Sequence, residues 1–259
     1  NRISKFGHFC PQKKGRSMAR YKIADVIFET NHIYGYTERL CKKYLYAGDL
    51  PSDFAVEITE ADIAAEKEKE GAEEFPDAYL ESLALFRKLC DYVLKYGNGT
   101  IFHSSAVAVD GEAYLFTAPS GTGKSTHARL WKEMLGDKMV YINDDKPIIR
   151  FIDGAFYVYG TPWNGKHHLD TDARAKIKAI CEIRRGEKNS IERVLPKDML
   201  GVVFNQTLRP EELADMDKFL SLTDKLLTSV PLYRLYCNIS AEAAELSYNT
   251  MKKGVLNED

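Results

Sequence analysis

The chain contains 259 residues and has a formal net charge of −2. This length suits one large α/β domain, or one catalytic domain with a smaller appendage. The hydrophobic fraction of 44% is enough to build a sizeable core. A nearly balanced charge is untypical of general nucleic-acid or membrane-surface binding, which needs a strong basic excess, so we expect neither partner.

The five cysteines lie far apart in the sequence and form no Cys-x-x-Cys pair. They are Cys10, Cys41, Cys90, Cys181 and Cys237. An odd and scattered set argues against a disulfide framework and against a zinc site. No apolar run approaches the roughly 20 residues of a membrane helix, and the N-terminus lacks the apolar core of a signal peptide. We therefore expect a protein of the reducing cytoplasm.

The N-terminal part of the chain divides into a tail and a small folded region. Residues 1–17 are polar and basic without periodicity, and Met18 follows them at once. We expect a tail or a cloning remnant there. Residues 18–99 are expected to form strands and helices packed on the core. Strands are predicted over 21–30 and 54–58, where β-branched, aromatic and apolar residues concentrate.

Two helical segments are predicted before the second half of the chain. Residues 77–96 carry apolar side chains at helical spacing, which predicts a helix with one face in the core. Residues 60–74 are rich in Ala, Glu and Lys and have few large apolar side chains. They indicate a solvated helix or a mobile linker, to which we assign no function.

Residues 100–259 are predicted to form the catalytic domain. Asp110-Gly111 and Asp153-Gly154 each separate two apolar runs and predict tight hairpins. Predicted strands span 101–103, 106–109, 113–117, 139–143, 147–152, 156–159, 177–183 and 233–237. Predicted helices span 126–135, 195–204, 210–229 and 241–252. The alternation indicates an α/β fold with a mixed, twisted sheet and helices packed outside.

A glycine-rich segment at 118–125, which we call the phosphate loop, stands between a predicted strand and a predicted helix. A strand, a glycine-rich turn and then Gly-Lys-Ser at a helix start are typical of nucleoside triphosphate binding. Glycines let backbone N–H groups curl around phosphate oxygens, and the helix start adds free donors. Ala118 replaces the first glycine of the general signature, which removes no ligand group.

The phosphate loop is predicted to bind ATP together with Mg²⁺. The expected nucleotide-binding residues are Ser120, Gly121, Thr122, Gly123, Lys124, Ser125 and Thr126. Lys124 can neutralise the β- and γ-phosphates, and the Ser125 hydroxyl can bind the metal ion.

Two adjacent acids, Asp144 and Asp145, follow the predicted strand 139–143. They lie only one helix and a turn after Lys124. One carboxylate can help to bind Mg²⁺, and the other can accept the proton of an attacking hydroxyl. The sequence does not order these two roles.

The sequence resembles the catalytic domain of HPr kinase/phosphorylase and its relatives over about residues 100–245. Four features carry the resemblance: His103 before the first hairpin, the phosphate loop, the close Asp144-Asp145 pair, and the segment 160–166 (Gly-Thr-Pro-Trp-Asn-Gly-Lys). That family shares the nucleotide-binding fold of phosphoenolpyruvate carboxykinase. The resemblance therefore implies a phosphate-loop core of this type, and transfer of a γ-phosphoryl group to a serine hydroxyl with Mg²⁺.

The resemblance also implies roles for side chains outside the loop. His103 would lie beside the transferred phosphate and orient or neutralise it. Lys166 would stabilise charge in the transition state, and Arg174 is a weaker candidate for the same role. HPr kinases carry an Arg-Gly-Leu-Gly segment where this chain has 160–166, so the resemblance does not identify HPr as the acceptor.

Several alternatives remain open at this point. The acceptor can be a Ser or Thr hydroxyl of a protein or peptide, or the hydroxyl of a small metabolite. A non-catalytic regulatory protein that only binds nucleotide is a third reading. His127 can contact the adenine or sugar, although we expect it to be exposed, and His167 and His168 are expected at the loop surface. Relatives assemble, so a homo-oligomer is expected.

Overall fold

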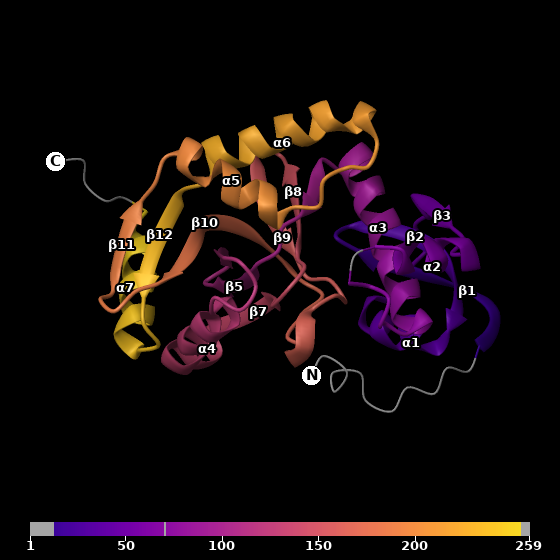
Figure 1. Cartoon of the computed structure of the whole chain (residues 1–259), viewed down its shortest axis with the longest axis horizontal. Helices are drawn as coiled ribbons and strands as arrows, with labels where there is room; N and C mark the ends of the chain where they lie inside the picture. Colours follow the sequence, from indigo (N-terminus) through magenta and orange to yellow (C-terminus); the bar gives the residue numbers. More distant parts are fainter. Residues whose placement is uncertain (1–12, 70, 255–259) are drawn as a thin grey trace. The chain divides into compact units, whose positions relative to one another are not determined.

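The computed structural model describes residues 13–69 and 71–254, and it divides into two compact units. The first unit ends at Val93, and the second begins at Leu94. Figure 1 follows the chain through both. Each unit has its own sheet and is described separately below.

The first unit is built on a three-stranded sheet in the order β1-β2-β3. The single strand predicted over 21–30 is wrong, because β1 (Lys13–Ile23) and β2 (Val26–Tyr34) form an antiparallel hairpin. The turn residues Ala24 and Asp25 have φ of 54° and 58°. Such a left-handed turn is normally marked by glycine, and this one has none. β1 begins inside the segment predicted as a tail, whose residues 1–12 lie outside the described part.

The remaining elements of the first unit are one short strand and several helices. They are α1 (Gly35–Leu40), the 3₁₀ turn η2 (Lys42–Tyr44), β3 (Phe54–Val56), α2 (Glu60–Lys67) and α3 (Asp77–Gly97). The predicted helix over 77–96 is confirmed by α3, which continues across the boundary between the units. α2 occupies the first half of 60–74, where Thr59 and Asp62 form a reciprocal capping box.

The buried carboxylate of Glu66 ties α2 to α3 and should make the first unit sensitive to acid. It accepts hydrogen bonds from Arg87 Nε and Lys69 Nζ, both at 2.7 Å. Burial alone would raise the pKa of Glu66, but these two cations outweigh it and hold the pKa below its usual 4.5. A depressed folded-state pKa stabilises the fold above the unfolded value, and this contribution disappears as the pH falls through the folded value.

We therefore expect Glu66→Gln to lower the free energy of unfolding by about 2 kcal/mol at pH 7. The deficit should shrink as the pH falls below 4.5, because Glu66 of the unfolded wild-type chain becomes protonated first, and it should be smallest below the lowered folded-state pKa, where Glu66 is neutral in both states. Urea unfolding at pH 7 and at successively lower pH measures both effects. Glu68→Gln, at an exposed position of the same helix end, is the control and should change little. An equal deficit at every pH would contradict the assigned ion pair.

The second unit is built on a mixed sheet that has nine strands among the described residues. The strands are β4 (Gly99–Ile101), β5 (Ser105–Val109), β6 (Glu112–Thr117), β7 (Met139–Asn143), β8 (Ile148–Ile152), β9 (Ala155–Tyr159), β10 (Arg174–Arg185), β11 (Ser190–Arg193) and β12 (Leu232–Cys237). Their order is β4-β8-β9-β10-β6-β5-β7, and β12 pairs with both β10 and β11. β10 runs parallel to β6 and β12, while the other pairs are antiparallel.

Helices cover both faces of this sheet (Figure 1). α4 (Lys124–Leu135) and α7 (Ala241–Lys253) bury Trp131 and Met251 in the core on one face. α5 (Pro196–Gln206) and α6 (Met216–Ser229) pack their apolar sides on the other. Short 3₁₀ turns are η3 (Gly136–Lys138), η4 (Gly165–His167) and η5 (Leu213–Asp215). The second unit is therefore a mixed α/β structure with a curled sheet between helices, as predicted.

Local turn signals were the most informative predictors of this sheet. Both predicted Asp-Gly hairpins are present, with positive φ at Asp110 and Asp153. Two strand predictions need correction. β4 ends at Ile101, so His103 lies in a loop and not on a strand. β11 was missed, because Ile191 is the one large apolar residue in Ser190–Arg193.

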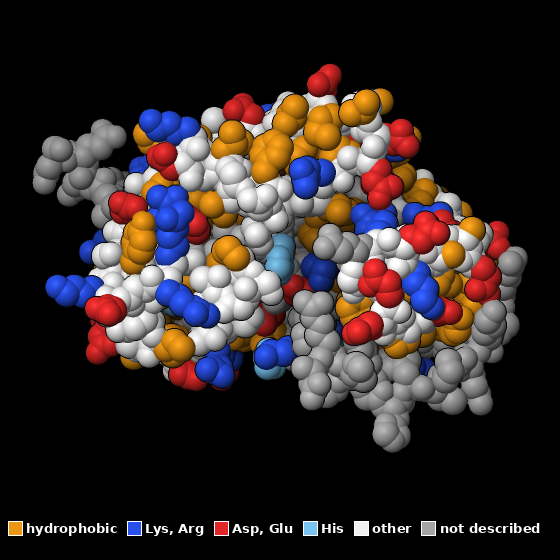
Figure 2. Space-filling model, in the orientation of Figure 1, with side chains coloured by type: hydrophobic (Ala, Val, Ile, Leu, Met, Phe, Trp, Pro, Cys, Tyr) orange, Lys and Arg blue, Asp and Glu red, His pale blue; other side chains and the backbone are white. Residues whose placement is uncertain are grey.

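The surface of the second unit mixes acidic and basic side chains, as Figure 2 shows for one face. Apolar atoms gather over α5 and α6 in the same view. Leu200 in α5, Leu213 in η5 and Leu220 in α6 are exposed. Within residues 13–69 and 71–254, none of the helices combines the length and apolar character that crossing a membrane requires.

Candidate functional site

The phosphate loop joins the end of β6 to the start of α4. Gly121 and Gly123 have φ of 78° and 129°, which side chains other than glycine rarely adopt. At both positions a Cβ would meet no atom within 4 Å, so open space lies beside the loop. Ser120 is exposed at the tip of the turn, and α4 begins at Lys124. The sequence-predicted order of strand, loop and helix is therefore present, with room beside the backbone for a ligand.

The side chain of Lys124 turns back into the loop and is nearly buried. Its Nζ donates to the carbonyl oxygen of Ala118 at 2.9 Å. Burial lowers the pKa of the ammonium group, and the nearby carboxylates of Asp145 and Asp144 oppose this shift. The lysine of the loop and both acids, which are separate in the sequence, are thus close enough to interact electrostatically.

Asp144 faces the start of α4. Its Oδ1 accepts a hydrogen bond of 2.5 Å from the Ser105 hydroxyl. Burial raises the pKa of Asp144, while the hydroxyls of Ser105 and Ser125 favour the charged form and limit the shift. The residue before it, Asn143, accepts from the backbone N–H of Asp145 and so shapes the turn that orients both acids.

Asp145 has a different environment from its neighbour. The Nε2 atom of His103 lies 3.0 Å from its Oδ1, and Lys146 Nζ donates to its Oδ2. Burial would raise the pKa of Asp145, but the bond to His103 and the charge of Lys146 lower it to about 2. The two acids therefore have different neighbours: serine hydroxyls influence Asp144, and His103 pairs with Asp145.

The segment 160–168 passes close to the acidic pair. A Cβ at Gly165 would come within 3.2 Å of Asp145 Cβ, so the backbone runs against this acid. Lys166 follows in η4 with an exposed side chain. His167 is exposed as expected, yet it lies near enough to favour the charged form of Asp144. Arg174 is placed elsewhere, with its guanidinium 5.3 Å from the centre of the Tyr157 ring.

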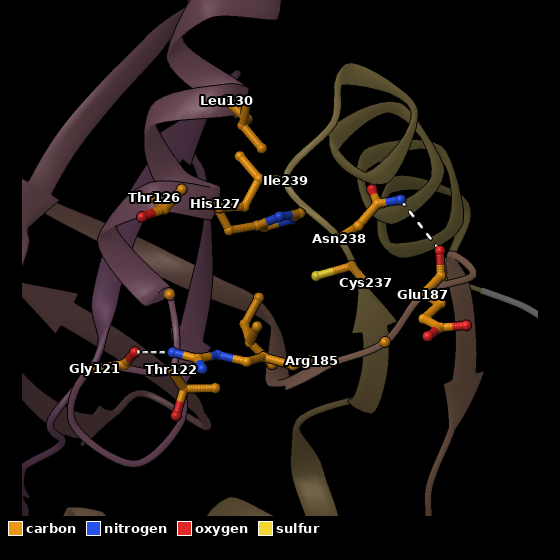
Figure 3. A pocket seen from close by; sticks show the side chains of 13 residues that line it. Gly121, Thr122, Thr126, His127, Leu130, Arg185, Glu187, Cys237, Asn238 and Ile239 are labelled. Atoms are coloured by element: carbon orange, nitrogen blue, oxygen red, sulfur yellow. Dashed lines mark hydrogen bonds between the residues drawn. The ribbon is translucent and has the colours of Figure 1, made fainter.

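Two residues of the site escaped sequence reasoning. Arg185, at the end of β10, donates from Nη2 to the carbonyl oxygen of Gly121 at 2.8 Å (Figure 3). The two residues are 64 positions apart, and no local pattern links them. His127 was expected to be exposed, but it is 3% exposed and its Nε2 lies 2.9 Å from the Ser247 hydroxyl. Burial lowers the pKa of His127 to about 4, so the ring is neutral at pH 7.

The donor set at Ser125 and Asp144 fits Mg²⁺. Within the described residues, no group of three or more His, Cys, Asp or Glu side chains could bind a metal ion. Mg²⁺ does not need such a cluster, because it is commonly bound by one or two carboxylates together with substrate phosphates and water. The Ser125 hydroxyl influences the charge of the Asp144 carboxylate, and the two groups can supply the protein part of that set beside the phosphate loop.

Comparison with known proteins gives limited information. No family model matches this chain, and no curated protein matches it. Among solved structures, 48 chains match. One is the HPr(Ser) kinase/phosphatase from Coxiella burnetii, with 9% sequence identity and a TM-score of 0.36. The match covers 59% of this chain and 91% of the other. A likeness this distant carries no argument about activity, so function has to be argued from the site.

Proposed function

We propose that this protein is an ATP-dependent, Mg²⁺-requiring phosphotransferase of the HPr kinase type, with a phosphate-loop core in its second unit. It transfers the γ-phosphoryl group to a Ser or Thr hydroxyl of a protein or peptide. The observation that supports this most is the convergence of Lys124 with Asp144 and Asp145 beside an open glycine loop. A protein that only bound nucleotide would need the loop but would have little use for two adjacent carboxylates near its lysine.

The geometry favours an order for the two acids. The Ser125 hydroxyl, which binds Mg²⁺ in phosphate-loop enzymes, favours the charged form of Asp144, so Asp144 is assigned to the metal side. Asp145 is paired with His103 instead, so it is assigned to the acceptor side. When bound, Mg²⁺ would be held by Ser125 and Asp144 and would neutralise negative charge on the phosphates.

The transfer itself is mostly a matter of position and electrostatics. The acceptor oxygen forms a bond to the γ-phosphorus, and the bond from that phosphorus to the bridging oxygen breaks to release ADP. The hydroxyl proton passes to the pair formed by Asp145 and His103. Lys124 and the N-terminal end of α4 stabilise negative charge on the phosphates, because both present positive charge to the loop.

The acceptor class rests on the sequence resemblance, and an incorporation assay tests it. The purified chain, γ-labelled ATP and Mg²⁺ are incubated with a Ser/Thr peptide library, with the same library in which every Ser and Thr is Ala, and with small hydroxylated metabolites. Label in the first library alone supports the proposal. Label in metabolites alone would replace the acceptor class. Tight ATP binding without label in any acceptor would favour the regulatory reading and contradict the proposed transfer.

A further inference from the structure

A pocket of about 650 Å³ opens beside the phosphate loop (Figure 3). α4 forms one wall with Thr126, His127 and Leu130. The loop between β12 and α7 contributes Asn238 and Ile239. Small-molecule pockets in proteins occupy roughly 300–1,000 Å³, so this volume suits a nucleoside-sized ligand.

The pocket is polarised along its length. At the loop end, Gly121 and Thr122 line it together with Arg185, whose guanidinium is bonded to the loop carbonyl. Glu187 also lines the pocket, apart from the Arg185–Gly121 hydrogen bond. The Asn238 side-chain amide donates from Nδ2 to the backbone carbonyl oxygen of Glu187. Figure 3 shows Arg185 beside Gly121, and it shows Glu187 at the right of the view. A ligand with phosphates at one end and hydroxyl or amino donors at the other matches this charge distribution.

Another part of the pocket lining is apolar and uncharged. Leu130, Ile183 and Ile239 line it, and Ile239 is 76% exposed although it is a large apolar side chain. The Cys237 thiol also lines the pocket, and burial raises its pKa, so it remains uncharged. Flat aromatic bases bind favourably between such side chains, because their faces are removed from water.

His127 lines the pocket and keeps one buried ring nitrogen without a hydrogen-bond partner among the described residues. The Ser247 hydroxyl donates its proton to the Ala244 carbonyl, so the His127 Nε2 facing Ser247 must carry a proton. The other ring nitrogen, Nδ1, is then an acceptor, and it has no hydrogen-bond partner among the described residues. A buried acceptor without a partner is destabilising, and a donor on a ligand that reached this nitrogen would offset that cost.

We propose that this pocket binds the nucleoside part of the nucleoside triphosphate, with the base against Leu130 and Ile239 and the phosphates running past Arg185 into the phosphate loop. The inference rests on the proposed function, since it takes the triphosphate in the loop as given. It adds a set of residues that no phosphate-binding motif contains, and it makes the enzyme selective for a nucleotide over a bare polyphosphate.

Calorimetric titration with ATP and with inorganic tripolyphosphate, both with Mg²⁺, tests the pocket. Tripolyphosphate carries the phosphate chain without a nucleoside. We expect the wild-type chain to bind ATP about tenfold or more tightly than tripolyphosphate, because only ATP removes apolar surface of the pocket from water. Ile239→Ser should reduce ATP affinity about tenfold and leave tripolyphosphate affinity unchanged. The exposed position of Ile239 means that this variant should still fold.

Leu213→Ser is the matched control, since Leu213 is a large apolar residue that is 86% exposed and does not line the pocket. It should change neither affinity. Equal wild-type affinities for ATP and tripolyphosphate, or an equal loss of both in Ile239→Ser, would overturn the pocket and leave the proposed phosphate site intact. Failure of the wild-type chain to bind either ligand would overturn the proposed function, and the pocket with it.

Discussion

Replacing Lys124 with methionine should reduce phosphoryl transfer by about 10³-fold or more, the scale at which phosphate-stabilising groups act. Lys124 provides positive charge inside the loop, near enough to both acids to interact with them electrostatically. Methionine keeps much of the side-chain length but leaves the phosphates facing Asp144 and Asp145 without a countercharge. Single-turnover transfer from labelled ATP, at saturating acceptor, measures the loss.

The control for this variant is Lys138→Met, at an exposed position after the same helix. It should keep both transfer and ATP binding. Thermal unfolding shows whether the Lys124→Met variant is still folded. Because the cost of burying the Lys124 ammonium outweighs the attraction of the two acids, which is why its pKa is lowered, we expect the variant to be no less stable than wild type. Unchanged transfer in a folded Lys124→Met chain would contradict the phosphate-loop assignment.

The second large effect should separate the two acids. Asp145→Asn should lower the transfer rate by about 10²–10⁴-fold, the usual contribution of a positioned proton acceptor, while the Mg²⁺ requirement stays unchanged. Asp144→Asn should instead raise the Mg²⁺ concentration needed for half-maximal rate by about tenfold, because one carboxylate ligand becomes a neutral amide. Rate measured against Mg²⁺ concentration distinguishes the two outcomes.

A matched control for both substitutions is Asp153→Asn. This residue lies in the β8–β9 hairpin with φ of 51°, a conformation that asparagine tolerates well. It should leave the rate and the Mg²⁺ curve as in wild type. If Asp144→Asn lowered the rate and Asp145→Asn raised the Mg²⁺ requirement, the proton-acceptor and metal-binding roles would be exchanged. Wild-type curves for both variants would rule out the catalytic use of the pair.

Sequence patterns predicted local features of the second unit well, since their causes are local. The Asp-Gly pairs determine tight turns through their backbone conformations, and two hairpins follow from them. The phosphate loop and the adjacent acids are short contiguous segments, so residue order alone reveals them. The first unit was harder, because Ala24-Asp25 forms the same kind of turn without the glycine that identifies it.

Contacts between distant segments could not be predicted in this way. His103 meets Asp145 because the loop after β4 lies next to the end of β7, and Ser104 N–H donates to the Asp145 carbonyl. Arg185 reaches the phosphate loop because β10 runs parallel to β6 with Glu182 opposite Thr117. Strand order and register set both contacts, and neither is encoded in a short pattern.

The amino-acid sequence by itself therefore determined the chemical groups of this protein: a glycine loop with its lysine, and two acids one helix later. Tertiary structure decided which groups meet: the Ser125 hydroxyl influences the charge of Asp144, and His103 pairs with Asp145. It also decided that His127 is buried and that a pocket lies beside the loop. The physical reason is that pairing and burial depend on which strands and helices pack together, and packing is a property of the whole chain.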